Sequence, residues 1–345
     1  MKDASIDIVI PNYNGVRFLK TCLDSIRCQD FGDWQVFLVD NGSQDGSVDF
    51  VRSYYPEVQI LALEKNTGFS PAVNLGIQAG RAPFVFLLNN DTELDANCLT
   101  CLFSAARQVD ADFFAAKMLS YKKRHLLDGA GEGFFRGGAG YRLGTMEEDG
   151  PLYNAPRQVF GACGGAAFYR RRVIEEVGLF DANFFAYLED VDWNLRAARM
   201  GKSCYYVPSA RVYHIGSATT GSKFNETTIR LSTRNLFFVL AKNYSLGMLL
   251  RYGLFIAIYQ FFWLLFILKK RQASPYVRGI IEAALGWRSM RKKFLAGREL
   301  IGEDTSLLRA QLRRAEDEAV SSIMQRRKAL GKGNALLNLY KRLFL

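Results

Sequence analysis

Trp34-Gln-Val-Phe-Leu-Val39 runs directly into Asp40-Asn-Gly-Ser-Gln-Asp-Gly-Ser47, and this junction decides the fold. An apolar run of strand length ends in a polar turn with glycine, and a helical pattern follows over Val48–Tyr55. Similar apolar runs, separated by helical patterns, lie at Ile6–Ile10, Val58–Leu63 and Phe84–Leu88. Strands that alternate with helices at this spacing predict an α/β fold, with a mostly parallel sheet covered by helices on both faces.

Polar clusters follow the predicted strands at the point where each strand ends. They are Asn12–Asn14, Asp40–Asp45 and Asn89–Asp91. Ligands of such sheets bind outside the carboxyl ends of the strands. The three clusters are therefore expected to converge on one edge of the sheet, and that edge is the predicted active site.

The positive charge of the chain is confined to its C-terminal part. Residues 269–345 hold 18 Lys and Arg against 7 Asp and Glu, a difference of +11 that equals the net charge of all 345 residues. The part before it is neutral, which argues against a nucleic-acid binder with a basic folded domain. A basic tail that follows the most apolar segment instead favours an anionic membrane surface.

That apolar segment is Leu246–Leu268, and its cleanest part, Tyr252–Leu268, has 17 residues, the lower limit for crossing a bilayer. A crossing would place Lys269-Lys-Arg271 and the basic tail outside, against the positive-inside tendency. We therefore expect a helix that lies in the membrane interface, with a true span as the alternative. Ile280–Leu295 has the composition of a second interfacial helix. Packing of these helices on each other or on a second copy of the chain, as a homo-oligomer, is the other interpretation.

The chain is thus divided into a catalytic domain, residues 1–243, and a helical, basic, membrane-associating region, residues 244–345. Its six cysteines form no paired framework, which suits a reducing cytosol. The polar start, Met1–Asp7, predicts no signal peptide. We expect a location at the cytoplasmic face of the inner membrane, peripheral or monotopic.

Several carboxylates suit chemistry at the sheet edge. Asp40 can accept the imino N–H of a pyrimidine base, and Asp91 suits a hard divalent cation such as Mg²⁺ or Mn²⁺, although each is equally the type of residue found in turns. Glu189 and Asp190 follow an aromatic run and can take a proton from a hydroxyl, or only complement a helix dipole. His214 follows a strand-like stretch, where a lone histidine is more often structural.

Together these motifs resemble the family 2 glycosyltransferases with a GT-A fold, and most of all the rhamnosyltransferase-like members that build bacterial surface polysaccharides. The resemblance covers roughly residues 5–240. It rests on Ile8–Gly15, Val39–Ser47, Asn66–Phe69, Asn74–Gly76, Leu87–Asp91, Gly161–Phe168, Val177–Asp181 and Phe184–Asp192 with Arg196.

The resemblance implies a role for each matching residue. Asp190, with Glu189 beside it, would be the general base for the attacking hydroxyl. Asp91 would contact the metal, and His214 would complete its site. The donor nucleotide sugar would be bound by Pro11, Asn12, Asp40, Asn66, Asn74 and Asn90.

The implied reaction is an inverting, metal-dependent transfer of a single sugar. The donor would be a dTDP- or UDP-sugar, for example dTDP-rhamnose. Asn89 stands where an Asp begins the D-x-D-like motif, which leaves the metal site with less charge. The Q-x-x-R-W motif of processive members is absent from the sequence. A polyprenyl-diphosphate-linked saccharide would be the acceptor, with Arg230 and Arg234 placed to meet its diphosphate or else to lie on a solvated helix face.

Two rival functions were weighed against this one. A nucleotidyltransferase would need a glycine-rich basic loop after the first strand, and Asn12–Arg17 matches that poorly. A non-enzymatic scaffold that binds nucleotide sugars in a membrane assembly would not need Asp91 or the Glu189-Asp190 pair.

Overall fold

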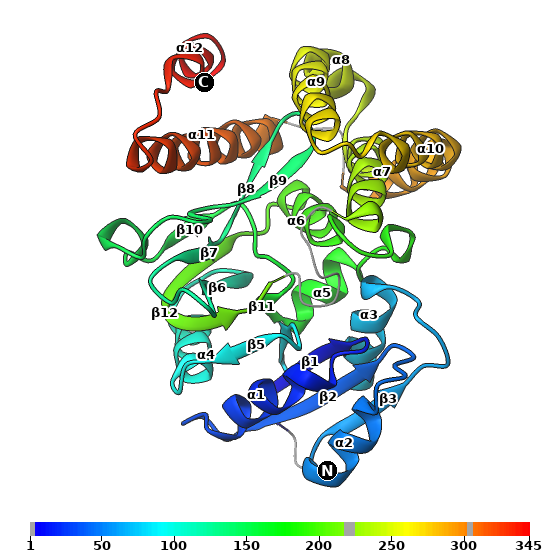
Figure 1. Cartoon of the computed structure of the whole chain (residues 1–345), viewed down its shortest axis with the longest axis vertical. Coiled ribbons are helices and arrows are strands. Elements are labelled where there is room, and N and C mark those ends of the chain that lie inside the picture. The colour runs from blue at the N-terminus through cyan, green and yellow to red at the C-terminus, as the bar shows by residue number, and fades with distance from the viewer. Residues whose placement is uncertain (1–3, 217–224, 302–305) are drawn as a thin grey trace.

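A computed structural model of the chain describes residues 4–216, 225–301 and 306–345. Its centre is a ten-stranded sheet, whose main path runs β10-β12-β6-β11-β4-β1-β2-β3 (Figure 1). Strand β5 pairs with β12, and β7 pairs with β6. The strands are β1 Ile6–Asn12, β2 Trp34–Asp40, β3 Gln59–Ala62, β4 Phe84–Leu88, β5 Thr92–Leu94, β6 Phe113–Ser120, β7 Leu127–Ala130, β10 Arg157–Val159, β11 Ala166–Arg170 and β12 Cys204–His214.

The first half of the sheet is parallel, as the sequence predicts. Strands β3, β2, β1 and β4 lie side by side in the same direction. The second half is mixed, because β11 runs antiparallel to both β4 and β6, whereas β12 is parallel to β6. A separate hairpin, β8 Glu132–Phe135 and β9 Ala139–Arg142, stands beyond this sheet.

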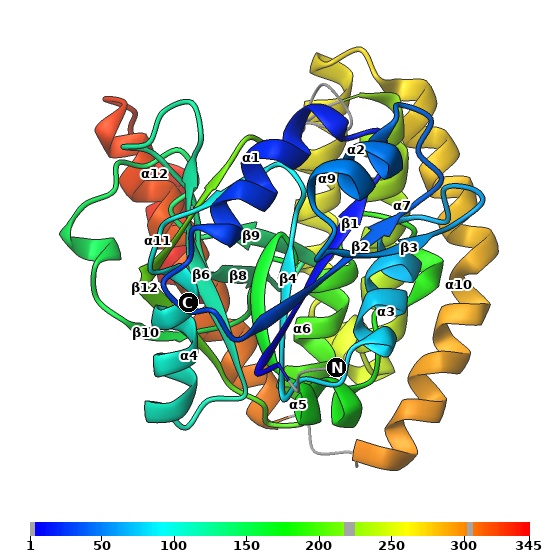
Figure 2. The ribbon, with the colours of Figure 1, turned by 90° about the horizontal axis from the view of Figure 1, so that it is seen from below.

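Helices cover both faces of the sheet (Figure 2). One apolar core joins the strands to α1 Val16–Arg27, α2 Ser47–Tyr54 and α4 Cys98–Gln108. A second core on the opposite face takes in α3 Phe69–Ala79, α5 Arg171–Val177 and α6 Glu189–Arg199. Alternate residues of β1 enter opposite cores, Ile8 and Ile10 the first and Val9 the second, as expected for a strand buried on both faces.

The C-terminal region is helical throughout its described part. It consists of α7 Glu226–Asn243, α8 Leu246–Arg251, α9 Gly253–Lys269, α10 Ala273–Ile301, α11 Ser306–Ala329 and α12 Ala335–Phe344. The apolar segment is broken at Tyr252 into α8 and α9. Among the described helices, none combines the length and apolar character required to cross a bilayer.

Polar and apolar contacts fix this region to the catalytic part. Helix α10 buries Ala283, Met290 and Phe294, and Arg291 donates to the carbonyl of Ala241 at 2.9 Å. Glu316 of α11 pairs with Arg136 of the β8–β9 turn, both buried. One side of α10 therefore packs on protein, in line with the alternative interpretation of this segment, whereas Ile281 and Leu285 of the same helix are exposed.

Candidate active site

Three of the polar residues predicted to bind the donor, Asn12, Asp40 and Asn90, meet at the carboxyl ends of β1, β2 and β4. The Asn12 amide donates to Asp40 at 2.9 Å, and the Asn90 amide donates to Asn12 at 2.6 Å. The second carboxylate oxygen of Asp40 accepts from the Ser43 backbone N–H at 3.0 Å. A Cβ at Gly15 would lie 2.1 Å from the Asn90 amide, so only glycine lets this turn approach so closely.

The other residues predicted to bind the donor lie around this cluster. Pro11 is half-buried near the end of β1. The Asn66 side chain accepts from the Gly68 N–H at 2.9 Å and from Asn41 at 3.1 Å, and so shapes the turn before α3. Asn74 exchanges two bonds with the backbone of Phe180, at 2.7 and 3.0 Å. Asn74 therefore anchors the segment that leads to α6.

Strand pairing brings Asp91 and His214 together from distant parts of the sequence. The end of β12 pairs with β5, which places His214 opposite Thr92. As a result, His214 Nε2 lies 3.3 Å from the Asp91 carboxylate, which also accepts from the Gly216 N–H at 3.1 Å. Both side chains are buried, and the Asn89 amide lies 3.5 Å from the same ring nitrogen.

Asp128 is a member of this group that the sequence analysis did not find. It lies 2.7 Å from His214 Nδ1 and also contacts Arg142. Burial works to lower the pKa of His214, but the bonds to Asp128 and Asp91 outweigh it and raise the pKa to about 9. Asp128 lies on β7 within a small-residue stretch, where no recurring motif distinguishes it.

This donor set fits a divalent cation. A carboxylate oxygen of Asp91 and Nε2 of His214 point at one another, and a second carboxylate holds Nδ1, the arrangement that orients metal-bound histidines in proteins. Without a cation, the protonated ring supplies the positive charge between the two carboxylates. Asn89 is an amide, so Asp91 is the carboxylate available from the D-x-D-like motif.

Asp190 lies close to this group. Its carboxylate accepts from the Gly164 N–H at 3.0 Å. The next residue, Gly165, accepts from the Asn89 N–H at 3.0 Å. Two consecutive glycines therefore join the carboxylate predicted to be the general base to the motif predicted to hold the metal.

The neighbouring acids of α6 have different surroundings. Glu189 is buried, one of its oxygens has no hydrogen-bond partner among the described residues, and burial together with the charge of Asp190 raises its pKa. Asp192 is fully buried and bonds to Lys242 at 2.7 Å and to Asn243 at 2.9 Å. Of the three acids, Asp190 is the one that is part-exposed.

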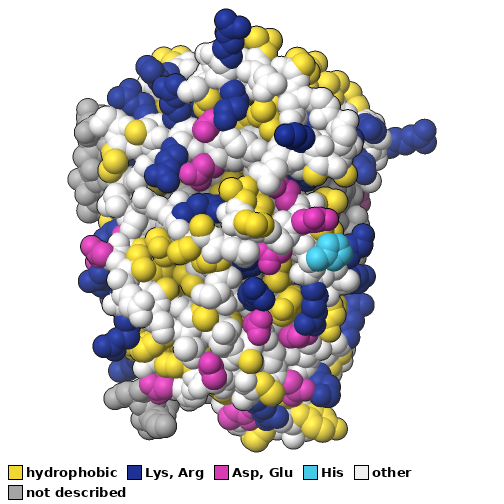
Figure 3. Space-filling view, turned by 90° about the vertical axis from the view of Figure 1, so that its left-hand side faces the viewer, with side chains coloured by type: hydrophobic (Ala, Val, Ile, Leu, Met, Phe, Trp, Pro, Cys, Tyr) yellow, Lys and Arg dark blue, Asp and Glu magenta, His cyan; other side chains and the backbone are white. Residues whose placement is uncertain are grey.

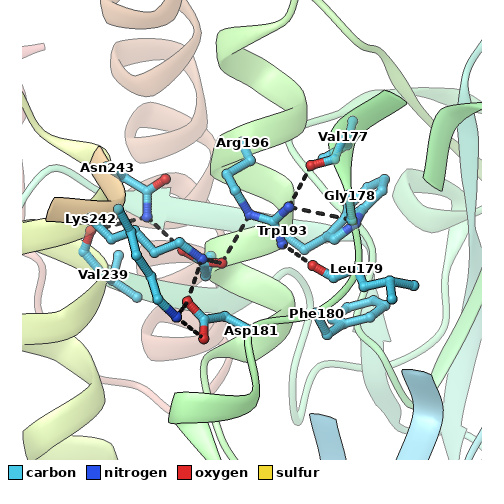
Figure 4. A network of polar contacts seen from close by, with 12 residues as sticks. Val177, Gly178, Leu179, Phe180, Asp181, Trp193, Arg196, Val239, Lys242 and Asn243 are labelled. Carbon is cyan, nitrogen blue, oxygen red and sulfur yellow. Dashed lines mark hydrogen bonds and ion pairs between the residues drawn. The ribbon is translucent and has the colours of Figure 1, made fainter. Parts of the chain in front are cut away.

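A charged network fixes α6 to the C-terminal helices (Figure 4). Lys242 of α7 contacts Asp181 at 2.8 Å as well as Asp192, and Lys293 of α10 contacts Asp181 at 2.6 Å. Burial favours the neutral acid at Asp181, yet the two ammonium groups hold its pKa well below the usual range. Asp181 and Asp192 therefore serve as structural anchors of the helix that carries Asp190.

The segment before Asp190 is conformationally strained. Phe185, Tyr187 and Leu188 all have positive φ values, of 64°, 72° and 64°, which are unfavourable for residues with a Cβ. The buried Asn235 of α7 holds this segment, because its amide donates to the carbonyls of Phe184, Ala186 and Tyr187 at 2.9, 2.9 and 2.7 Å.

A second carboxylate faces Asp190. Oxygens of Glu132 and Asp190 and the sulfur of Cys163 all lie within 4.8 Å of one another. Burial and the charge of Asp190 raise the pKa of Glu132, while the Asn194 amide donates to it at 3.0 Å. Burial also raises the pKa of the Cys163 thiol. Both groups therefore favour their protonated forms, which works against cation binding in this cluster.

Arg230 and Arg234, predicted to meet a diphosphate, lie side by side on α7 and share one carboxylate. Glu282 of α10 is 2.7 Å from Arg230 and 3.7 Å from Arg234. Arg234 also donates to the carbonyl of Phe184 at 2.6 Å. Both guanidinium groups therefore have protein partners, and Arg234 takes part in holding the strained segment.

Comparison with known proteins identifies the family of the chain. Residues 7–178 match the model of glycosyl transferase family 2. N-acetylglucosaminyl-diphospho-decaprenol L-rhamnosyltransferase of Mycobacterium tuberculosis is 29% identical over 238 residues, which are 63% of this chain and 78% of the relative. The uncharacterized glycosyltransferase YwdF of Bacillus subtilis is 26% identical over 252 residues, 67% of this chain and 84% of the relative.

One solved structure shares the fold over most of this chain. GalNAc-T7 in complex with UDP, GalNAc and Mn²⁺ superposes with a TM-score of 0.56 at 16% identity, over 70% of this chain and 48% of that one. The family match and the relatives define the class as a glycosyltransferase that uses a nucleotide sugar. The chain belongs to glycosyl transferase family 2, and the resemblance seen in the sequence is confirmed.

Proposed function

We propose that the chain is an inverting, metal-dependent transferase that moves a single sugar from a dTDP- or UDP-sugar to a hydroxyl of a lipid-linked saccharide. The observation that carries the proposal is the placement of the part-exposed Asp190 carboxylate, held by Gly164, beside the group formed by Asn89, Asp91 and His214. One site thus holds a base for the acceptor and a cation position for the leaving diphosphate.

In this mechanism the nucleotide lies against Asn12, Asp40 and Asn90 at the carboxyl ends of the strands. Asp190 takes the proton of the acceptor hydroxyl as its oxygen attacks the anomeric carbon from the face opposite the diphosphate. Asp91 and His214 would hold Mg²⁺ or Mn²⁺, which neutralises charge on the departing diphosphate.

The donor and acceptor classes are carried over from the rhamnosyltransferase of Mycobacterium tuberculosis. The name of that enzyme describes transfer of L-rhamnose to a diphospho-decaprenol-linked N-acetylglucosamine. We extend both classes to this chain, namely an activated deoxyhexose such as dTDP-rhamnose and a polyprenyl-diphosphate-linked sugar used in surface polysaccharide synthesis.

Helix α9 supports an acceptor at a membrane surface. It is apolar all round, yet Ile267 is its one fully buried residue, and Leu254, Phe261, Phe262, Leu265 and Leu268 are exposed. A helix of this composition is expected inside protein or lipid. Trp263 of α9 donates to Thr233 of α7 at 3.0 Å, two residues before Asn235, so the apolar surface lies near the strained segment. We propose that this face of α9 rests in the interface of the cytoplasmic leaflet.

The proposal is tested by nucleoside diphosphate release from a panel of dTDP- and UDP-sugars, with a polyprenyl-diphosphate-linked N-acetylglucosamine as acceptor. We expect turnover of one donor that needs both the acceptor and Mg²⁺ or Mn²⁺, and that EDTA abolishes. The product should show inversion at the anomeric carbon by NMR. Donor binding without turnover under all these conditions would favour the scaffold function instead.

A further inference from the structure

A basic pocket lies in the C-terminal region, away from the residues of the catalytic site. Its volume is about 540 Å³, and its lining comes from the β8–β9 turn, α8, α11 and α12. Five arginines line it, and no Asp or Glu is among the described residues that do so: Arg136, Arg251, Arg309, Arg313 and Arg342. Figure 3 shows one face of the molecule, and Lys and Arg side chains gather over the upper part of that face, where α11 and α12 lie.

The five arginines differ in whether their charge is balanced. Arg136 is buried, pairs with Glu316 and lies 4.2 Å from the centre of the Phe255 ring, so it is part of the protein core. Arg313 donates to an oxygen of Leu345, the last residue of the chain. Arg251, Arg309 and Arg342 have no hydrogen bond or ion pair with any described residue. Three unbalanced guanidinium groups from three helices therefore surround one hollow.

Like charges at close range repel, so an anion in the hollow would stabilise the three guanidinium groups. Guanidinium groups bind phosphate oxygens in pairs and are weakly hydrated, which makes them suited to phosphate esters. The lining also holds apolar side chains, because it includes Leu343, which is 62% exposed, together with Phe344 and Leu345. A phosphate that carries a hydrocarbon chain would satisfy both features.

We propose that this pocket binds the phosphate group of an anionic ligand, and that the ligand is the headgroup of an anionic membrane lipid. The choice of a lipid rests on the membrane contact of α9 proposed above. The chemistry of the pocket, phosphate on arginine, does not depend on that choice. In this arrangement Leu343 and the apolar face of α9 enter the same leaflet as the lipid chains.

The test uses the full chain and vesicles of phosphatidylcholine with or without phosphatidylglycerol, in a sedimentation assay. The test variant is Arg309→Gln with Arg342→Gln. The matched control is Arg288→Gln with Arg314→Gln, which removes two exposed charges from α10 and α11 that do not line the pocket. Near a charged membrane each arginine contributes about 5-fold to binding, so the test variant should lose about 30-fold and the control less than about 5-fold.

Each outcome separates the possibilities. Equal losses in the two variants would mean a diffuse basic surface and would overturn the pocket. Failure of the wild type to bind any vesicle would overturn the membrane contact, while donor turnover would remain an independent assay of the transferase. Inorganic pyrophosphate, titrated by calorimetry, distinguishes the phosphate sources. If it binds the wild type and not the test variant, and vesicles do not bind, the ligand is a soluble phosphate compound and the lipid is overturned. Absence of both kinds of binding overturns the site.

Discussion

Replacement of Asn235 is expected to lower catalytic activity strongly while the protein remains folded. Its amide has two N–H groups and holds three carbonyls of the strained segment at 2.7 to 2.9 Å. A buried hydrogen bond contributes about 0.5–1.5 kcal/mol net, so Asn235→Ala should cost about 1–3 kcal/mol of unfolding free energy. Since domains have about 5–15 kcal/mol, the variant should remain folded.

The larger effect should be on the chemical step. Three residues with positive φ store about 1–3 kcal/mol each, more than the remaining bonds from Arg234 and from the Phe69 N–H can offset. The segment should then relax and displace Asp190, which follows it directly. A shift of about 1 Å at a reacting group lowers the rate about 100-fold. Donor affinity should fall much less than kcat, because Asn12, Asp40 and Asn90 have no hydrogen bond to Asn235 and only the turn at Phe69 contacts the segment.

The assay compares kcat with the donor dissociation constant and with denaturant unfolding in the same preparations. Asn334→Ala is the matched control, since it also removes an amide bond to a carbonyl, that of Met324, far from the site. Asn235→Asp should be more damaging than Asn235→Ala, because a carboxylate would face three carbonyl oxygens. The reasoning is refuted if Asn235→Ala loses no more activity than Asn334→Ala at equal stability.

Three further outcomes are expected. Asp190→Asn should bind the donor normally and lose transfer by about 100- to 10,000-fold, and near-normal turnover would exclude Asp190 as the base. A metal must displace the proton of His214, whose pKa is about 9, so Mn²⁺ affinity should rise about tenfold between pH 7 and 8 when it is measured by electron paramagnetic resonance. Asp128→Asn should weaken Mn²⁺ binding about 10- to 100-fold. A flat pH response would place the metal elsewhere. The pKa of Glu132 is raised in the folded state, so the folded state loses stability as pH rises above 4.5 through the folded pKa. Glu132→Gln should therefore increase the unfolding temperature at pH 8 and not at pH 4. A shift of the unfolding temperature that is independent of pH would contradict this assignment.

The parallel half of the sheet follows from local sequence, since each strand there ends in its own polar turn. Convergence of Asn12, Asp40 and Asn90 was predictable for the same reason and is confirmed by their hydrogen bonds. The roles of the predicted site residues remain predictions, although the structure brings Asp91 and His214 into contact.

What local pattern does not encode is contact between distant segments. Asp128 joins the site only because β7 pairs with β6, and Asn235 meets the segment before Asp190 only because α7 packs on it. Glu282 comes from a helix whose composition indicates a membrane surface, yet it binds Arg230. Pairing of this kind is decided by tertiary packing, which composition and periodicity do not report.

The pairing of β5 with β12 has a consequence for synthesis of the protein. Asp91 and its partner Gly216 are 125 positions apart, so the ribosome needs roughly 6–25 s to deliver the second after the first. During that interval the emerging polypeptide has Asn12, Asp40 and Asn90 but not His214. Under the proposed mechanism the nascent chain would therefore be inactive until β12 is inserted, and a metal bound afterwards would stabilise the closed sheet by mass action.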